Sequence, residues 1–216
     1  MSSLKFMLAK EFMKGGKVDP TGWLISEKFD GYRACYDPTK HHFFSRQNKP
    51  FNAPEWFIDA MPETFIDGEL WIGRNMFQGM GAVRKKVPID EEWFNITFQV
   101  YDLPEFQGTF QERLVELERI VSMKKDLWNT MRNSFEYPFN KLECPLVMAE
   151  QIVVKNESHL DKVYKDIIKH GGEGIMLKDP NSPYEGKRSN YLLKYKPNFD
   201  AEGIIIGYKP GQNKYT

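Results

Sequence analysis

Short apolar runs bounded by turn residues fill the first half of the chain. Residues 22–37 (GWLISEKFDGYRACYD) predict a strand, a tight turn and a second strand, and residues 41–51 (HHFFSRQNKPF) predict a strand that leaves into a loop. Residues 63–73 (ETFIDGELWIG) and 95–104 (NITFQVYDLP) predict two more strands, because both runs are apolar and rich in aromatic residues. The early chain is therefore expected to be rich in β-structure.

Helical periodicity begins after Thr109, which forms a capping-box pattern with Glu112. The apolar face that follows consists of Leu114, Leu117, Ile120 and Val121. A second helix is predicted over residues 158–172, with Ser158 and Asp161 at its start and glycines at its end. Its apolar face consists of Leu160, Val163, Tyr164, Ile167 and Ile168. Both helices are interpreted as structural.

The last third of the chain returns to strand-like patterns. Residues 173–180 (EGIMLKDP) and 191–197 (YLLKYKP) predict two strands, and residues 201–216 (AEGIIIGYKPGQNKYT) begin another strand that stops in a turn rich in Gly, Pro and Lys. Strands and helices together predict an α+β fold, with two or more mostly antiparallel sheets and peripheral helices.

Composition describes an ordinary globular chain of 216 residues, of which 41% are hydrophobic and 28% are charged. This length allows one sizeable core, or one domain plus a fragment. Thirty basic and thirty acidic residues give a formal net charge of +0. A chain without a global basic field does not capture nucleic acid non-specifically, so any nucleic-acid contact must be local.

Cellular location is predicted from what the sequence lacks. No apolar run is long enough for a signal-peptide core or a membrane-spanning helix, so we expect an intracellular protein, in cytoplasm or nucleus. Cys35 and Cys144 are far apart and show no metal-ligand spacing. They are interpreted as two reduced, buried thiols.

Charged and hydrogen-bonding side chains recur at or near the ends of the predicted strands. They are Lys28, Asp30, Arg33, Arg46, Asp67, Glu69, Tyr101, Asp102, Glu173, Lys194 and Lys196. Taken alone, each has a purely structural explanation. The Asp-Gly pair within residues 26–33 is typical of a surface hairpin. Arg46 is typical of a solvated loop, and Lys194 and Lys196 are typical of an edge strand whose charges prevent pairing with another strand. Their joint order along the chain favours a functional site.

Six motifs in this order resemble those of the covalent nucleotidyltransferase superfamily, which comprises ATP-dependent DNA ligases, RNA ligases and mRNA capping enzymes. EKFDGYR (27–33) is similar to the Lys-x-Asp-Gly-x-Arg nucleophile motif, and FFSRQNK (43–49) is similar to the motif after it. The other four are FIDGELW, QVYDLP, GGEGIMLKDP and LLKYKP. The likeness runs from about Leu8 to Pro197, and six ordered motifs are a specific signal.

Details within these motifs favour the small ATP-dependent DNA ligases of bacteria and viruses. NAPEWF (52–57), DGELW and the glutamate of GGEGIML are similar to those ligases, whereas capping enzymes usually carry Asp at that last position. The resemblance implies an enzyme that seals nicks in duplex DNA through a covalent lysyl-AMP intermediate, with ATP and Mg²⁺ or Mn²⁺ as cofactors. The alternatives are an RNA ligase, a capping guanylyltransferase, or a non-catalytic module that binds nucleotide or nick ends.

The resemblance assigns Lys28 as the nucleophile that takes AMP. A lysine amine is protonated at neutral pH, so Lys28 must be desolvated or set among cations to react. We expect Arg33, Lys194, Lys196 and a bound metal to supply that field. The same resemblance implies that Glu69 contacts the ribose hydroxyls and that Tyr101 stacks on adenine, where many relatives have Phe.

The remaining assignments concern the adenine edge, the metal and the phosphates. Ser26 is expected to contact the adenine edge, and Glu173 is expected to bind the divalent metal. Arg46 and Arg188 match positions associated with the phosphates of the adduct or of the nick. A local basic patch for DNA is expected at Arg84, Lys85 and Lys86, although a solvated helix face is the alternative for that stretch.

Domain boundaries follow from the extent of the motifs. Residues 1–199 are expected to form the nucleotidyltransferase, or adenylation, domain, and residues 200–216 to form the first strand of a truncated oligonucleotide-binding (OB) fold. We expect this chain to act as a monomer with nicked double-stranded DNA and ATP as partners and no membrane. Without the rest of the barrel, weak nick binding and little nick sealing are expected.

Overall fold

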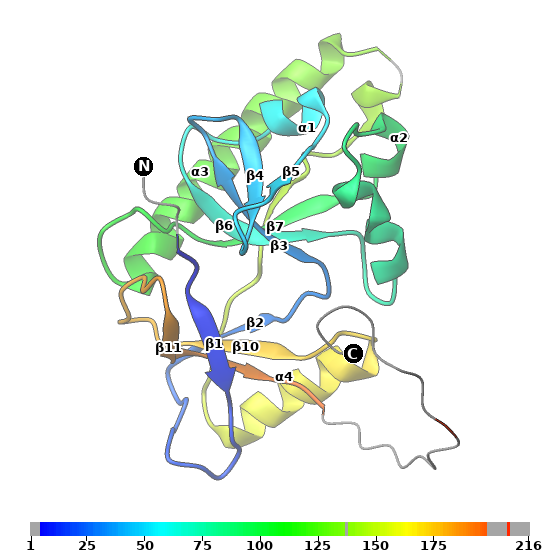
Figure 1. Ribbon diagram of the computed structural model, residues 1–216. Coiled ribbons are helices and arrows are strands. Elements are labelled where there is room, and N and C mark those ends of the chain that lie inside the picture. Colours follow the sequence, from blue (N-terminus) through cyan, green and yellow to red (C-terminus); the bar gives the residue numbers. More distant parts are fainter. Residues whose placement is uncertain (1–4, 137, 198–206, 208–216) are drawn as a thin grey trace.

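Two twisted β-sheets, one above the other, form the frame of the molecule (Figure 1). The computed structural model describes residues 5–136, 138–197 and 207. Within these residues, the five-stranded sheet has the order β1 (Leu8–Glu11), β11 (Arg188–Tyr195), β10 (Ile175–Lys178), β2 (Leu24–Glu27) and β9 (Ile152–Val153). The six-stranded sheet has the order β5 (Pro50–Phe51), β4 (His42–Ser45), β3 (Tyr32–Asp37), β6 (Ile66–Trp71), β7 (Thr97–Asp102) and β8 (Leu146–Met148).

Most strand pairs in both sheets are antiparallel. The two exceptions among the described residues are β1 with β11 and β7 with β8, which are parallel. Helices lie around the sheets: α1 (Glu55–Asp59), η1 (Phe77–Arg84), α2 (Asp90–Trp93), α3 (Phe110–Met131), η2 (Arg132–Ser134), η3 (Phe139–Lys141) and α4 (Glu157–Lys169). The predicted α+β fold of mostly antiparallel sheets with peripheral helices is confirmed.

The chain crosses from one sheet to the other at residues 28–31. The sequence predicts a strand, a turn and a strand here, and the structure has β2 before the turn and β3 after it. However, β2 pairs with β10 and β9, whereas β3 pairs with β4 and β6. The surface-hairpin alternative for this stretch is therefore wrong, because the two strands part into different sheets.

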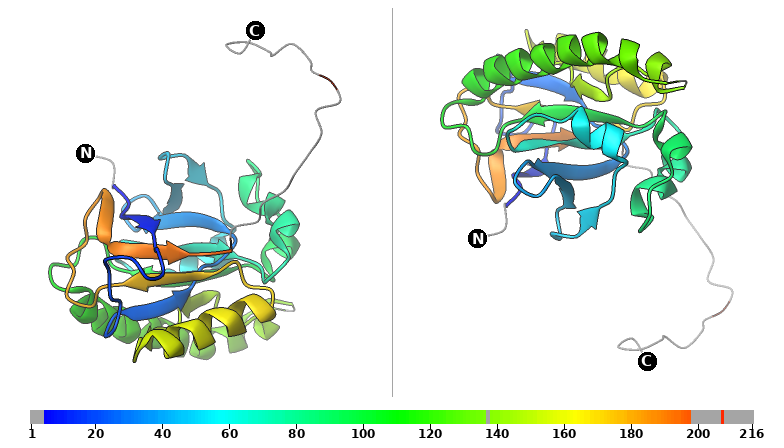
Figure 2. Two further views of the ribbon diagram at one scale, coloured as in Figure 1. Left: turned by 90° about the horizontal axis from the view of Figure 1, so that it is seen from below. Right: turned by 90° about the horizontal axis from the view of Figure 1, so that it is seen from above.

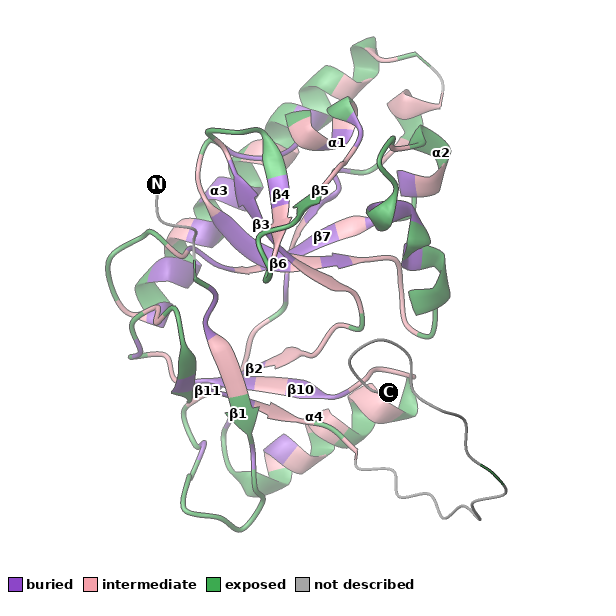
Figure 3. Cartoon of the chain, in the orientation of Figure 1, coloured by how far each residue is buried: buried purple, intermediate pink, exposed green. Residues whose placement is uncertain are grey.

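The six-stranded sheet buries its core against α3. The capping box predicted at Thr109 is present: the Thr109 side chain accepts from the Glu112 backbone N–H, and the Glu112 side chain accepts from the Thr109 N–H. Phe110 and Leu117 are buried against strand residues such as Phe98. Burying a side chain of this size stabilises the fold by about 1.5–3 kcal/mol. Figure 3 shows buried segments along these strands and exposed ones on loops and outer helix turns.

The five-stranded sheet packs against α4, and Figure 2 shows α3 and α4 on the same side of the molecule. Leu160 of α4 is buried, and Val163 and Ile167 pack against the same core cluster. The helix begins at Glu157, one residue before the predicted start, because the Asn156 side chain accepts from the His159 N–H and makes Asn156 the N-cap. The predicted position of Ser158 at the start of the helix is thereby corrected.

Several smaller expectations are also settled. Cys35 and Cys144 are both free and buried, as predicted. Within the described residues, no helix has the length and apolar character needed to cross a membrane. The predicted strand of a truncated OB fold at residues 200–216 lies outside the described residues, apart from Gly207.

Candidate active site

A cavity of about 720 Å³ lies between the two sheets, and its size suits a small-molecule ligand. Every nucleotide-site residue that the sequence predicts lines it: Ser26, Lys28, Arg33, Arg46, Glu69, Tyr101, Glu173, Lys194 and Lys196. Two of the four residues predicted to bind DNA, Arg84 and Arg188, line it as well. Side chains spread over about 170 positions of the sequence thus meet in one place.

Strand pairing in the five-stranded sheet brings Lys28 to Glu173. β2 and β10 are antiparallel, with Glu27 opposite Ile175, and the Lys28 N–H donates to the Gly174 carbonyl at 2.9 Å. The Lys28 Nζ then donates to the Glu173 carboxylate. Gly174 has φ +156°, and a Cβ there would lie 2.4 Å from the Tyr195 carbonyl, so this turn requires glycine.

The charges around Lys28 differ from the cluster of cations that the sequence analysis expects. Its partner is a carboxylate, and Lys196 reaches the same Glu173 carboxylate at 3.6 Å. Lys194 is paired with Glu11 at 2.7 Å. Arg33 and Lys194, two of the expected cations, line the same cavity and are each paired with an acid, Asp67 and Glu11 respectively.

The opposite wall of the cavity comes from the six-stranded sheet. Arg33 donates to both oxygens of Asp67, at 3.1 and 2.6 Å, and to the Met7 carbonyl at 2.6 Å. Glu69 lies opposite Arg33 in the β3–β6 register. Burial raises the pKa of Glu69 from 4.5 to about 8, even though Arg33 and Lys28 act to lower it. The raised pKa favours the protonated form of Glu69 at neutral pH.

Tyr101 lies beside this acidic group on β7. Its hydroxyl donates to the Gly68 carbonyl at 3.3 Å, and the Arg33 guanidinium lies 5.7 Å from the ring centroid. Burial raises the pKa of Tyr101 well above its ordinary value. The ring lines the cavity as an uncharged aromatic surface, which is the surface that a purine base can stack on.

A buried ionic network lies beside the cavity and reaches it through Lys178. Asp102 at the end of β7 accepts from Lys178 at the end of β10 and, at 2.6 Å, from Arg113 of α3. Asp102 and Arg113 are at most 1% exposed, so the three charges join both sheets and α3 within the protein interior. The nearby Tyr184 hydroxyl donates to Asp67 at 2.8 Å. The sequence does not single out Tyr184, because a tyrosine in a loop carries no pattern that marks a site.

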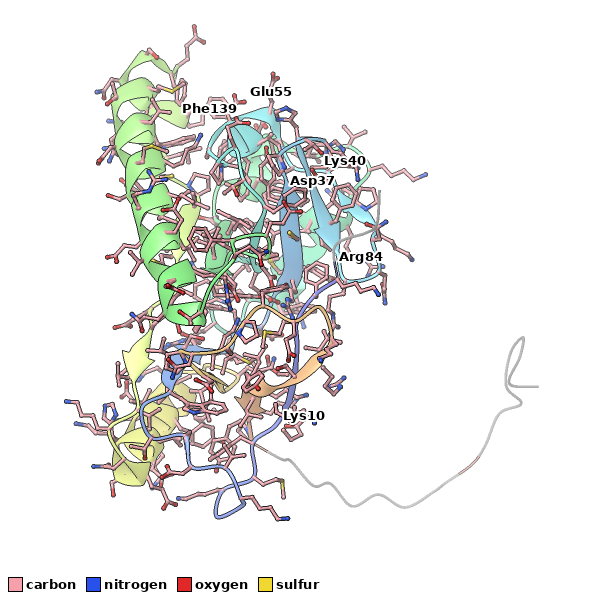
Figure 4. All side chains as sticks on the ribbon, turned by 90° about the vertical axis from the view of Figure 1, so that its left-hand side faces the viewer. Lys10, Asp37, Lys40, Glu55, Arg84 and Phe139 are labelled. Atoms are coloured by element: carbon pink, nitrogen blue, oxygen red, sulfur yellow. The ribbon has the colours of Figure 1, made fainter. Side chains whose placement is uncertain are left out.

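The basic residues predicted to bind DNA fall into two groups. Arg84 and Arg188 line the cavity, and Arg188 donates to the Ala9 carbonyl at 2.5 Å. Lys85 is bonded to Glu92 at 2.6 Å, and Lys86 is exposed. Figure 4 labels Arg84 beside the six-stranded sheet. The structure therefore brings two of the four cations to the cavity and leaves the other two on the surface.

A carboxylate that faces the cavity can hold a divalent cation together with a nucleotide. Glu173 lines the cavity, and oxygen ligands such as its carboxylate suit Mg²⁺ and Mn²⁺. Among residues 5–136, 138–197 and 207, no group of three or more His, Cys, Asp or Glu side chains is arranged to hold a metal ion. Glu173 therefore fits an ion that shares its coordination with substrate phosphates, as Mg²⁺ commonly does.

Comparison with known proteins gives consistent results. A sequence model described as the ATP-dependent DNA ligase domain matches residues 6–196. A DNA ligase of Haemophilus influenzae is 31% identical over 90% of this chain and 65% of its own length. A DNA ligase of African swine fever virus is 26% identical over 91% of this chain and 44% of its own length. The chain therefore spans less than two thirds of the length of these two relatives.

Two solved structures share the fold. One, from a study of Lig E DNA ligases described as binding DNA with a minimal scaffold, has a TM-score of 0.78 and 27% identity. The match covers 98% of this chain and 75% of that one. The Chlorella virus DNA ligase-adenylate has a TM-score of 0.68 at 18% identity, over 89% of this chain and 68% of that one. At that identity the likeness shows the fold alone.

Proposed function

This chain belongs to the family of ATP-dependent DNA ligase domains, and from that premise we propose that it carries the adenylation chemistry of a ligase that seals nicks in duplex DNA. The observation that supports this proposal best is the contact between the Lys28 ammonium and the Glu173 carboxylate inside a nucleotide-sized cavity. The cavity lining also includes an aromatic ring, a second acidic side chain and several cations. A nucleotide needs this combination for its base, its ribose and its phosphates.

The proposed first step is covalent. The Lys28 amine, once deprotonated, attacks the α-phosphorus of ATP; a P–N bond forms, the P–O bond to the β-phosphate breaks, and pyrophosphate leaves with the electron pair. The proton must first leave the ammonium, and the Glu173 carboxylate already in contact with it is placed to accept that proton. A divalent cation bound beside Glu173 and the phosphates would supply positive charge that weakens the hold of this carboxylate on the ammonium.

Nucleotide recognition is divided between the two sheets. We assign Tyr101 to stacking on adenine and Ser26 to the edge of the base. Glu69, kept neutral by burial, can both donate and accept hydrogen bonds at the ribose hydroxyls. Lys194 and Lys196 lie on or next to β11 at the same cavity and are assigned to the phosphate charge.

The later steps use the same cavity with DNA. AMP is transferred to the 5′-phosphate of the nick, and the 3′-hydroxyl then attacks that phosphate and releases AMP. Arg46 and Arg188 line the cavity and are assigned to these phosphates, and Arg84 extends the basic surface. We propose that a monomer carries out these steps inside the cell, where ATP is available.

Labelling with radioactive ATP tests the function directly. Incubation with α-³²P-ATP and Mg²⁺ is expected to give an acid-labile, base-stable adduct with the added mass of AMP, whereas α-³²P-GTP is expected to give none. A preformed adduct is then offered nicked duplex DNA and nicked duplex RNA. Release of AMP only with DNA supports a DNA ligase. Labelling by GTP would indicate a capping enzyme, transfer to RNA an RNA ligase, and an absence of adduct a binding module.

A further inference from the structure

Arg74 joins the two sheets at the end of the cavity opposite Asp102. It lies in the loop between β6 and η1 and binds Glu27, the last residue of β2, through Nε and Nη2, each at 2.8 Å. Its Nη1 also lies 3.4 Å from the carbonyl of His170, the C-cap of α4. Paired N–H···O bonds between guanidinium and carboxylate fix orientation as well as distance. The negative end of the α4 dipole adds to the attraction.

The residues next to this ion pair are packed so closely that their positions depend on the position of the ion pair. Asn75 lies against Gly171, where a Cβ would be 2.3 Å from the Asn75 side-chain nitrogen. A Cβ on Gly172 would be 3.1 Å from the Glu27 carboxylate. Gly171 also has φ +83°, in the left-handed region that favours glycine. The loop after β6 thus holds in place both Glu27 and the two glycines that precede Glu173.

These contacts connect the chain segments that carry the proposed chemistry. Glu27 immediately precedes Lys28, Gly172 immediately precedes Glu173, and Arg74 follows the strand that carries Glu69. Among the described residues, the cavity lining includes Glu27 but not Arg74. Arg74 therefore acts on the cavity through the segments it holds, not as part of the cavity wall.

The side-chain contacts that join the two sheets differ between the two ends of the cavity. At one end, the Asp102, Lys178 and Arg113 network lies in the interior, with side chains at most 9% exposed. At the other end, the Arg74 side chain is 32% exposed and that of Glu27 is 16% exposed. Water and ions compete with a partly exposed ion pair much more than with a buried one. The ion pair at the Arg74 end is therefore more open to competition than the network at Asp102.

We propose that Arg74 is a positioning residue for lysine adenylation: through Glu27 and the 171–172 glycines it sets the separation of Lys28 and Glu173 from Glu69 across the cavity. This inference rests on the proposed function. Misplacement of reacting groups by about 1 Å can cost about 100-fold in rate. Lysine cannot replace the bidentate guanidinium, so the charge alone does not suffice.

Single-turnover adenylation measures this role. Arg74→Ala is expected to lower the maximal rate of lysyl-AMP formation by about 10- to 100-fold. The ATP concentration for half-maximal rate is expected to change less than about threefold, because Arg74 is not in the cavity wall. Arg74→Lys is expected to recover only part of the rate. The double variant Glu27→Gln with Arg74→Ala is expected to be no slower than the slower single variant, because both changes break one interaction.

Arg132→Ala is the matched control. Its side chain is 29% exposed, close to that of Arg74, and it binds Glu143 at 3.0 Å outside the cavity lining. Its adenylation rate should stay within about twofold of the unaltered protein. Melting temperatures of both alanine variants should fall by less than about 4 °C, as expected for a partly exposed ion pair in a protein of this size. A large fall for Arg74→Ala alone would indicate a structural role and overturn the proposal.

Hydrogen exchange without nucleotide tests the contact of Arg74 with Glu27 independently of activity. Arg74→Ala should speed exchange in residues 24–28 and 171–175, including the Lys28 N–H bonded to Gly174, while exchange around Asp102 stays unchanged. If the unaltered protein forms no lysyl-AMP, the proposed function fails. Hydrogen exchange alone then decides whether Arg74 holds residues 24–28 and 171–175 in place. Unchanged exchange, or an Arg74→Ala rate equal to that of Arg132→Ala, overturns the inference.

Discussion

Lys28 and Glu173 lie 145 positions apart in the sequence and form an ion pair in the folded protein. The pair exists because β2 and β10 are antiparallel neighbours and because the Gly174 turn brings its carbonyl to the Lys28 N–H. A proposed nucleophile and the acid placed to accept its proton are thus held together by strand register. Single substitutions can separate the roles of this pair from those of the residues around it.

Replacing Lys28 with arginine separates nucleophilicity from charge. Lys28→Arg keeps a cation beside Glu173, so the fold is expected to keep its stability, but a guanidinium stays protonated and cannot attack phosphorus. We expect the AMP adduct to disappear in mass spectrometry of Lys28→Arg and of Lys28→Ala. The control is Lys40→Ala, a surface lysine paired with Asp37 at 3.3 Å, which should label normally. An adduct that persists in Lys28→Arg refutes the assignment.

Tyr101 is expected to act through its ring. Tyr101→Phe removes one 3.3 Å hydrogen bond to the Gly68 carbonyl and should leave nucleotide affinity nearly unchanged. Tyr101→Ala removes the aromatic surface and should weaken binding by about 1–3 kcal/mol, the usual value of base–aromatic stacking. Isothermal titration calorimetry with ATP would measure both. Equal damage from Phe and Ala would mean that the hydroxyl carries the binding and that the adenine position is wrong.

Glu69 should make stability depend on pH. Its pKa is about 8 in the folded protein and 4.5 ordinarily, so between these values the unfolded chain has released a proton that the folded protein retains. The contribution of Glu69 to the free energy of unfolding is therefore fully present below about pH 4.5. It falls as pH rises toward 8, by on the order of 1 kcal/mol per pH unit.

Glu69→Gln removes this titration. The stability advantage of Glu69→Gln over the unaltered protein should grow from pH 5 to pH 8 and then level off, as measured by urea unfolding at each pH. Other groups titrate equally in both proteins, so the difference isolates Glu69. A difference that is constant over this range would show that Glu69 is already ionised in the folded state.

The buried network at Asp102 should be essential for stability. Asp102→Asn leaves the buried cations of Lys178 and Arg113 without their anion, which should cost about 3–5 kcal/mol in urea unfolding. Asp37→Asn is the control, because Asp37 is also buried but bonds mainly to Thr39 within a surface turn. It should cost only about 1 kcal/mol. Similar losses in the two variants would contradict the importance of the network.

Neighbouring cations should contribute unequally to DNA binding. Arg84 lines the cavity, whereas Lys85 is bonded to Glu92 at 2.6 Å. We expect Arg84→Ala to weaken binding to a nicked duplex and to lower the salt slope of the affinity by about one phosphate contact. Lys85→Ala should change both much less. Fluorescence anisotropy at several salt concentrations would measure this, and equal effects would place the basic patch on the surface and away from the cavity.

The sequence by itself determined the elements and the residues that meet in the cavity. Apolar runs predicted the strands that carry Glu69 and Tyr101 and the strands that lie next to Lys28 and Glu173. The capping box predicted the start of α3 at Phe110. These signals are local: a period of two or 3.6 residues, a turn pair or a cap is written within a short window of sequence. The ordered motifs added the family, which the comparisons confirm.

Tertiary structure alone decided which of these residues touch. Local patterns do not state that β2 and β3 part into different sheets, nor that Arg74 of one sheet's loop binds Glu27 of the other sheet. Strand register and burial likewise decided that Lys28 faces a carboxylate and that the pKa of Glu69 is raised. Charge pairing and desolvation depend on distances between segments remote in sequence, and those distances are fixed only when both sheets pack.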